Sequence, residues 1–223
     1  MTEKRKWSED EISRLRADVK TRMSEKRYLH TLAVEDMAVR LSELFCPEKK
    51  DTLRVAALLH DITKEKTLDE QTELCRRYSI PVTEMDLLSP KTFHAKTAAA
   101  IIPDEYPNFA DEEVISCVRW HTTGRAGMTV EEKLVYLADY IDMTRKFHDC
   151  VMLREFFWNP EPSEMTIPER ELHLDRIMLM SFDMTVKGLI EEEAVISEDT
   201  VTARNETVAA IKMKIKERKD NYE

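Results

Sequence analysis

An apolar stretch that ends in two polar residues constrains the fold of this chain more than any other feature. Residues 55–59 read Val-Ala-Ala-Leu-Leu and are followed directly by His60 and Asp61. A helix of this composition is expected to be buried, and an imidazole and a carboxylate buried with it are unfavourable unless both find partners. A metal ion would satisfy both side chains at once. The fold must therefore bring further ligands to this point.

Four other residues could complete such a site. His30, His94, His121 and Asp139 each lie on a separate segment that is predicted to be helical. For any one of these histidines alone, a hydrogen-bonded position in the core is the simpler explanation. Together, however, two buried aspartates and four histidines need a neutralisation that divalent metals provide better than a few arginines. The sequence predicts a two-metal hydrolytic site with the ligands His30, His60, Asp61, His94, His121 and Asp139.

The pattern of the chain predicts an all-α protein. Only three glycines occur among 223 residues, and helix-forming Ala, Leu, Met, Glu, Lys and Arg fill long stretches. Ser8 with Glu11 and Thr129 with Glu132 are typical of capping boxes at helix starts. Apolar periodicity predicts helices over about residues 26–45, 48–63, 68–78, 95–102, 111–121, 129–141, 168–193 and 200–219.

We expect three parts along the chain. Residues 1–25 are predicted to form an N-terminal helix that packs on the bundle, residues 26–148 the core, and residues 149–223 a C-terminal helical extension. The proline-containing stretch 156–170, within the extension, is interpreted as a linker that precedes the last two predicted helices. His148 and His173 lie in polar stretches and are predicted to be on the surface.

Charge and cysteine content narrow the class of protein. The net charge of -10 argues against a nucleic-acid partner, because binding to phosphate backbones needs a basic face. The four cysteines are widely spaced and predict reduced, core-facing thiols. The sequence has neither a signal-like start nor a stretch as long as a membrane span. A cytoplasmic protein without a membrane partner is the expectation.

The ordered motifs resemble the HD-domain superfamily of metal-dependent phosphohydrolases. His30, His60-Asp61 and Asp139 match its H…HD…D signature, and the segments RYLHT, LLHDITK, FHAKTAA, WHTTGRAGM and EEKLVYLADYID extend the match. The fuller pattern is similar to the YqeK family, the symmetrical bis(5'-nucleosyl)-tetraphosphatases, over about residues 27–147. The resemblance implies an HD-domain helical bundle with additional C-terminal helices. It also implies hydrolysis of diadenosine tetraphosphate to two ADP.

The resemblance also implies roles for individual residues. His30, His60 and Asp139 would hold one metal, His94 and His121 the other, and Asp61 would bridge them, with attack by a metal-bridging hydroxide. Iron is the implied metal, and imidazole-rich ligation also suits manganese, zinc or nickel. Asp61, Lys64 and Arg145 are the predicted catalytic residues. The predicted substrate contacts are Arg27, Lys64, Lys66, Thr122, Arg125 and Arg145.

The sequence departs from the family pattern in three places and leaves several alternatives open. Ala126 replaces the usual proline, Asp142-Met143 replaces the usual Glu-Pro, and the tract after Arg145 lacks the usual Phe-Pro-Gly. The alternatives are another HD phosphohydrolase, such as a nucleotidase or a phosphodiesterase, and a non-catalytic module that binds nucleotide or metal. A small-molecule nucleotide is the expected partner, with a homodimer as a further possibility.

Overall fold

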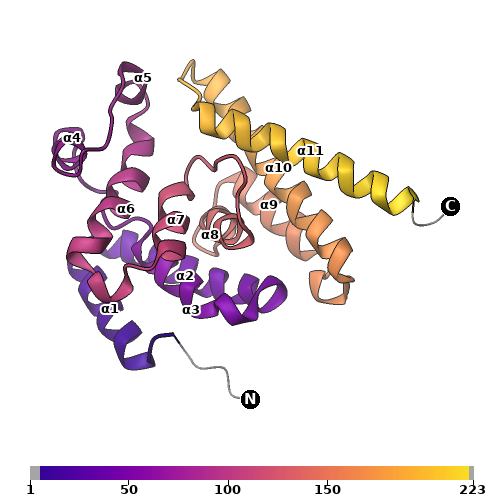
Figure 1. The fold of residues 1–223 in the computed structure, drawn as a ribbon, viewed down its shortest axis with the longest axis horizontal. Helices are drawn as coiled ribbons and strands as arrows, with labels where there is room; N and C mark the ends of the chain where they lie inside the picture. Colours follow the sequence, from indigo (N-terminus) through magenta and orange to yellow (C-terminus); the bar gives the residue numbers. More distant parts are fainter. Residues whose placement is uncertain (1–5, 221–223) are drawn as a thin grey trace. The chain divides into compact units, whose positions relative to one another are not determined.

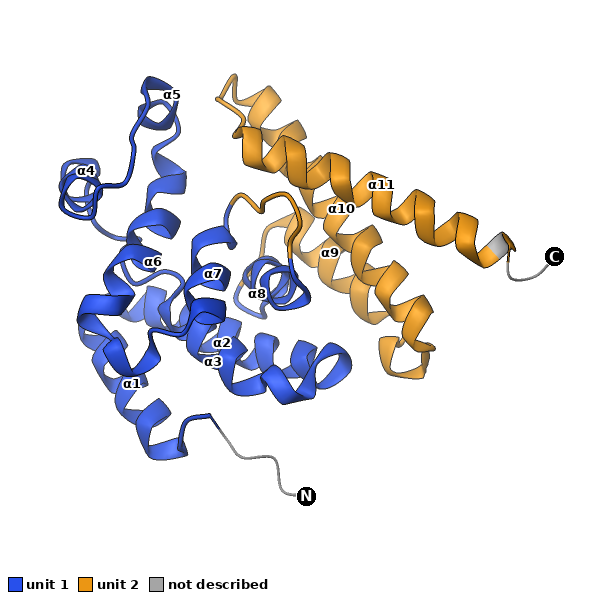
Figure 2. Cartoon of the chain, viewed as in Figure 1, with its two compact units in different colours: residues 1–122, 129–144 blue, residues 123–128, 145–223 orange. Residues whose placement is uncertain are grey.

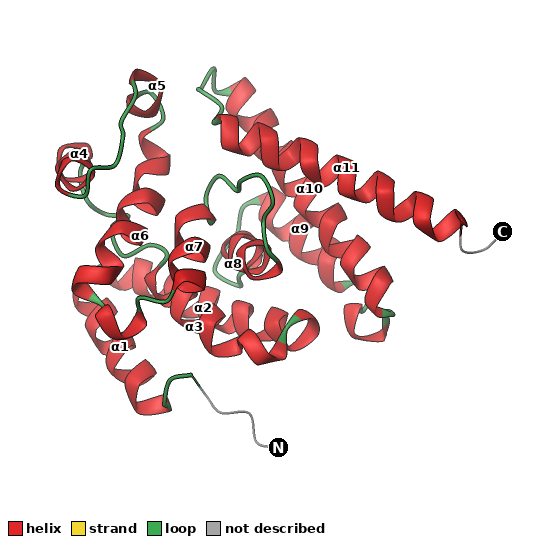
Figure 3. Cartoon of the chain, in the orientation of Figure 1, coloured by secondary structure: helices red, strands yellow, loops and turns green. Residues whose placement is uncertain are grey.

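The computed structural model describes residues 6–220, which form helices and connecting loops without any strand (Figures 1 and 3). The α-helices are α1 (Glu9–Thr21), α2 (Glu25–Phe45), α3 (Lys50–Leu59), α4 (Leu68–Arg77), α5 (Glu84–Leu87), α6 (Phe93–Glu105), α7 (Glu112–Trp120), α8 (Val130–Ile141), α9 (His148–Trp158), α10 (Ile167–Glu191) and α11 (Glu198–Asp220). Short 3-10 turns lie at Pro47–Lys49, Pro90–Thr92, Pro107–Phe109 and Pro162–Glu164. The all-α prediction is confirmed.

The chain folds into two compact units, which Figure 2 shows in different colours. The first unit contains residues 1–122 and 129–144 and holds α1 to α8. The second contains residues 145–223 with α9 to α11, and it also includes the short loop 123–128 between α7 and α8. The chain therefore leaves the first unit and re-enters it within one loop.

Local sequence signals account for several helix starts. The Ser8 and Glu11 side chains form the predicted capping box on α1, and Thr129 with Glu132 does the same for α8. In each box, one hydroxyl accepts from a backbone N–H of the first turn while the glutamate accepts from the backbone N–H of the cap residue. These pairs satisfy backbone donors that the helix itself leaves without partners.

The first unit is a bundle in which α2, α3, α7 and α8 pack against one another. Helix α6 packs on α7, α4 on α6, and α1 on α3. The middle of α3 is completely enclosed, since residues 55–59 have no exposed surface. The end of α3 therefore delivers His60 and Asp61 into the interior of the bundle, as the apolar run predicts.

A buried charge network connects the first three helices. Glu35 on α2 accepts hydrogen bonds from Arg16 on α1, at 2.7 and 2.6 Å, and from Arg54 Nε on α3, at 3.2 Å. The guanidinium of Arg54 also donates to Glu9 at 2.7 and 2.9 Å. Because each buried charge here has an opposite partner, the network fixes how α1 sits on α2 and α3.

Three details differ from the sequence predictions. Helix α3 ends at Leu59, so His60 and Asp61 lie in the following turns instead of inside the helix. The predicted linker 156–170 is partly helical, because α9 continues to Trp158 and buries Phe157. His173 is buried, not exposed: its ring stacks on Phe157 and its Nε2 lies 3.0 Å from the Phe157 carbonyl oxygen. A nearby aromatic pair that sequence periodicity does not reveal accounts for this position.

The exposure of His148, the state of the cysteines and the character of the helices can also be compared with the sequence predictions. His148 is exposed, as predicted, and all four cysteines are buried and free. Across the described residues 6–220, no helix combines the length and the apolar character that crossing a bilayer requires.

Candidate metal centre

Six side chains from five segments meet inside the first unit. His30 comes from α2, His94 from α6 and Asp139 from α8, while His60 with Asp61 and His121 lie directly after α3 and α7. These are the six residues that the sequence predicts as metal ligands. All except Asp139 are buried, and the Asp139 side chain is only 14% exposed. The structure thus gathers acidic and imidazole groups where water has little access.

The first group of ligand atoms, here called the His30 side, consists of His30, His60 and Asp139. His30 Nε2 lies 2.9 Å from Asp139 Oδ1, and His60 Nε2 lies 3.8 Å from the same oxygen. One ligand atom from each of the three residues lies within 4.8 Å of the others. This spacing suits a single cation bound by two imidazoles and a carboxylate.

The second group, here called the His94 side, consists of His94 and His121. Their Nε2 atoms are 3.0 Å apart, and they lie 3.3 Å and 3.8 Å from Asp61 Oδ1, respectively. His60, Asp61 and His121 also offer ligand atoms within 4.8 Å of one another. A cation on this side would therefore share Asp61 with the first group.

Asp61 lies between the two sides, and its two oxygens face different histidines. Oδ1 faces His94 and His121, while Oδ2 lies 3.4 Å from His60 Nε2 and 3.9 Å from His30 Nε2. Oδ2 also accepts a hydrogen bond of 2.6 Å from Arg27 Nη1. The ion pair with the Arg27 guanidinium favours the charged form of this buried group. Asp61 is therefore a carboxylate with one oxygen available to each side.

Backbone carbonyls fix which nitrogen of two imidazoles carries the proton. His60 Nδ1 lies 2.6 Å from the Ala57 carbonyl oxygen, and His121 Nδ1 lies 2.7 Å from that of Val118. A carbonyl oxygen only accepts, so Nδ1 is the donor, and in the neutral ring Nε2 keeps its lone pair. Burial lowers the pKa of both His94 and His121, which favours neutral rings on the His94 side.

The surroundings of His60 Nε2 indicate whether a metal ion fits this cluster. Among the described residues 6–220, the buried His60 Nε2 has no hydrogen-bond partner. Its lone pair faces two carboxylates, which is unfavourable because neither group can donate a proton. A divalent cation removes this conflict, since it accepts electron pairs from imidazole and carboxylate alike. The ligand set therefore fits a metal site.

Of the predicted substrate contacts, three adjoin the cluster, Lys66 lies on the surface, and two belong to the second unit. Lys64 Nζ lies 3.2 Å from His94 Nε2, and the Thr122 hydroxyl lies 3.2 Å from Nε2 of both His94 and His121, so both residues adjoin the cluster. Arg27 reaches the cluster through its ion pair with Asp61. Lys66 is exposed and lines a surface hollow together with Asp69 and Glu70.

Arg125 and Arg145 belong to the second unit. In the described residues, Arg125 Nη1 donates to the Ala126 carbonyl oxygen at 3.0 Å, and the Arg145 carbonyl accepts from Arg154 at 2.9 Å. Their roles as phosphate contacts stay predictions from the sequence.

Sequence reasoning missed a set of supporting residues behind His30. The Nδ1 atom of His30 lies 3.2 Å from Thr144 Oγ1 and 3.4 Å from Asp142 Oδ2. The Thr144 hydroxyl donates to Asp142, so its oxygen can accept from His30 Nδ1. Burial would raise the pKa of Asp142, but hydrogen bonds from His30 and Thr144 outweigh it and lower that pKa. Asp142 stands out in the sequence only as a departure from the family pattern.

A second set of supporting residues, Thr63, Gln71 and Thr97, contacts the backbone of His94 and the turn after Asp61. The Thr63 hydroxyl lies 3.0 Å from the His94 carbonyl oxygen and 2.8 Å from the Thr97 hydroxyl. The Gln71 side chain donates to the Thr63 carbonyl oxygen at 2.6 Å and accepts from Thr97 at 2.5 Å. All of these groups are buried, so the turn after Asp61 is fixed against α4 and α6. Scattered threonines and one glutamine give no sequence signal of such a network.

Comparisons with known proteins place the chain in a family. The HD domain matches residues 27–144. The chain is 30% identical over 189 residues to a symmetrical bis(5'-nucleosyl)-tetraphosphatase of Bacillus subtilis (strain 168), covering 85% of this chain and 93% of that protein. It is 35% identical over 162 residues to the protein of the same name from Staphylococcus aureus (strain NCTC 8325 / PS 47), covering 71% of this chain and 80% of the relative.

A solved structure agrees with these matches. A predicted HD superfamily hydrolase involved in NAD metabolism, from Clostridium acetobutylicum, aligns with a TM-score of 0.75 and 30% identity over 92% of this chain and 98% of that one. The fold and the buried His-Asp cluster therefore define an HD-domain protein. Within that class, the chain belongs to the family of the symmetrical bis(5'-nucleosyl)-tetraphosphatases. The resemblance predicted from the ordered motifs is confirmed.

Proposed function

We propose that this chain cleaves dinucleoside tetraphosphates symmetrically, releasing two nucleoside diphosphates, at the cluster around Asp61. The names of the relatives support the substrate class and the position of the bond that is cleaved. The observation that carries the proposal is the division of Asp61: its two oxygens face separate histidine groups. A carboxylate in that position suits two cations bound side by side.

We further propose that the His30 side holds one divalent cation, that the His94 side holds another, and that Asp61 contacts both. The imidazole-rich ligand set favours iron, manganese, zinc or nickel over magnesium, and iron is the first expectation. When bound, such cations neutralise phosphate charge and provide a nucleophilic water near neutral pH. The protein would be soluble and cytoplasmic, as its sequence predicts.

The residues of the chain then have distinct tasks. Arg27 holds Asp61 Oδ2 through its ion pair of 2.6 Å and so keeps Oδ1 directed at the His94 side. Lys64, whose ammonium group lies beside His94, stabilises the negative charge that builds up on the departing nucleoside diphosphate. Thr122, Lys66, Arg125 and Arg145 contribute phosphate contacts. A net charge of -10 makes such local cations necessary for a polyanionic substrate.

Product analysis tests the proposal. Protein purified without added metal is examined by elemental analysis and then incubated with diadenosine tetraphosphate, and the products are separated by chromatography. Symmetric cleavage gives ADP alone, whereas asymmetric cleavage gives AMP with ATP. Asp61→Asn, which keeps the shape of the side chain but removes its charge, is the matched inactive control.

Three further substrates separate the proposal from its alternatives. NAD, a dinucleoside diphosphate, is included because the related solved structure is that of a predicted hydrolase involved in NAD metabolism. AMP and cyclic AMP report on a nucleotidase and a phosphodiesterase. Faster turnover of any of these than of the tetraphosphate, or products other than ADP, would contradict the proposal.

A further inference from the structure

Helices α9 to α11 have no task in the function proposed above, yet the unit that they form also contains the loop between α7 and α8. Residues 123–128 form this loop and group with α9 to α11 (Figure 2). The loop carries Arg125, and its first residue, Thr123, is joined directly to Thr122. The contacts of the loop with α10 and α11 therefore bear on residues that we expect to bind phosphate.

Two hydrogen bonds tie both ends of the loop to α11. The Thr200 hydroxyl donates to the Thr123 carbonyl oxygen at 3.0 Å, and the Gly127 backbone N–H donates to Glu206 Oε2 at 2.5 Å. Thr200 and Thr123 are only 4% and 6% exposed, so water cannot readily replace the first bond. Helix α11 thus fixes the path of the loop at its beginning and near its end.

Gly124 packs between the two C-terminal helices. A Cβ atom at this position would lie 2.9 Å from Phe182 Cζ on α10 and 3.1 Å from Ala203 Cβ on α11, both of which are buried. Its φ of +65° is in the left-handed region that favours glycine. Gly127 has a similar φ of +62°, but a Cβ atom there would meet nothing within 4 Å beyond its chain neighbours. Of these two glycines, Gly124 alone must lack a side chain for the loop to pack.

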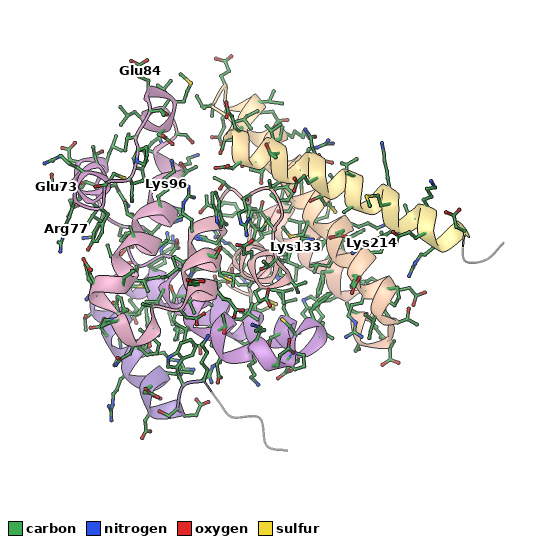
Figure 4. All side chains as sticks on the ribbon, in the orientation of Figure 1. Glu73, Arg77, Glu84, Lys96, Lys133 and Lys214 are labelled. Atoms are coloured by element: carbon green, nitrogen blue, oxygen red, sulfur yellow. The ribbon has the colours of Figure 1, made fainter. Side chains whose placement is uncertain are left out.

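The helices that hold the loop are themselves fixed to each other. Arg204 on α11 pairs with Asp183 on α10 at 2.7 Å, and Lys214 donates to the buried Asp175 at 2.8 Å (Figure 4 labels Lys214). Because α10 and α11 pack against each other and both contact the loop, a shift of either helix would affect the loop.

We propose that Phe182, Thr200 and Glu206 are positioning residues, through which the C-terminal helices set the conformation of loop 123–128 and hence the placement of Arg125 and Thr122 for the phosphate chain of the substrate. The roles of Arg125 and Thr122 rest on the proposed function. The loop contacts themselves do not depend on it. The C-terminal helices thus act on substrate binding through the loop, without supplying a catalytic group.

Thr200→Val tests this assignment, because valine keeps the shape of threonine and removes the donor to Thr123. We expect the KM for diadenosine tetraphosphate to rise roughly three- to tenfold, the effect of one lost neutral hydrogen bond, while kcat and metal content stay close to those of the wild type. Thr200→Ser keeps the hydroxyl group and should restore most of the affinity. In an Arg125→Ala background, Thr200→Val should add little further loss.

Limited proteolysis gives a readout that needs no substrate. Trypsin cleaves after Arg125 when the loop opens locally, and the fragment ending at Arg125 is identified by its mass. Thr200→Val and Gly124→Ala should both speed this cleavage. Gly127→Ala, the matched control with the same backbone strain but open space, should speed it less. Circular dichroism of each variant shows whether the helices are still formed.

Two results would overturn the inference. One is a Thr200→Val protein that is cleaved at Arg125 no faster than the wild type. The other is a faster cleavage that leaves the KM unchanged while Arg125→Ala raises it. If the wild-type chain does not hydrolyse the tetraphosphate at all, the proposed function fails, and the proteolysis result still decides whether α10 and α11 hold the loop.

Discussion

The His30 side and the His94 side use the same kind of imidazole ligand but differ in charge. The His30 side has its own carboxylate, Asp139, at 2.9 Å from His30 Nε2. The His94 side shares Asp61 and has the Lys64 ammonium group 3.2 Å from His94 Nε2. Since negative charge strengthens and positive charge weakens cation binding, the His30 side should hold its cation more tightly. If both cations bind as proposed, the His94 side, with less compensated cation charge, should be the better receptor for a phosphate group.

The support behind each side differs as well. On the His30 side, His30 is backed by the side chains of Asp142 and Thr144, although His60 of the same side is backed by the Ala57 carbonyl. On the His94 side, His121 is backed by the backbone carbonyl of Val118. A side-chain partner can be changed by mutation, whereas a backbone carbonyl cannot. Substitution of Asp142 should therefore affect the His30 side and spare the His94 side.

The largest expected effect comes from the residue that both sides share. Asp61→Ala removes the only carboxylate whose oxygens face both histidine groups among the described residues. We expect loss of bound metal from both sides and a fall in kcat of more than about a thousandfold. Elemental analysis and the product assay measure the two effects. Full metal content in the folded variant would contradict the bridging role.

Lys64→Ala should separate chemistry from metal binding. We expect metal to be retained and kcat to fall by roughly a hundredfold, as when one group that stabilises developing charge is removed. Lys26→Ala, an exposed lysine at the start of α2, is the matched control and should leave both properties unchanged. If Lys64→Ala loses its metal, the assigned role of the ammonium group is wrong.

Asp142→Asn should weaken the His30 side alone. The amide keeps the size of the side chain but no longer stabilises the proton on His30 Nδ1, and loss of such a partner typically lowers metal affinity by about 10- to 100-fold. Competition with a chelator measures the affinity, and Asp142→Glu tests whether a displaced carboxylate suffices. An unchanged affinity in Asp142→Asn would leave Asp142 without a positioning role.

The smallest expected effect is the difference in metal affinity between the His30 side and the His94 side of the wild-type protein. Stepwise removal of metal by a chelator should occur in two stages, separated by roughly a factor of ten in affinity, because of the charges of Asp139 and Lys64. His121→Ala should abolish the weaker stage and keep the stronger one. A single stage in the wild type would show that the charge difference has no consequence for metal binding.

The sequence predicts much of the fold because its signals are local. Apolar periodicity locates most of the helices to within a few residues, and the capping boxes at Ser8 and Thr129 form as predicted. His173 and the stretch 156–170 are interpreted incorrectly because their burial depends on aromatic neighbours in the fold. The six candidate ligands are recognisable since their residue types and order match a known signature, although their role as ligands stays a proposal.

The all-α class, the family and the residues that meet at the cluster follow from the order of the amino acids, because helix formation depends on nearby residues and the family signature depends on residue order. Three features become visible only in the folded chain: Asp61 directs one oxygen to each histidine group, Ala57 and Val118 fix the protons of His60 and His121, and Thr200 of α11 is hydrogen-bonded to loop 123–128. Each of them depends on how side chains and carbonyl groups are oriented after packing. Residues far apart in the chain set that orientation, and no local pattern records it.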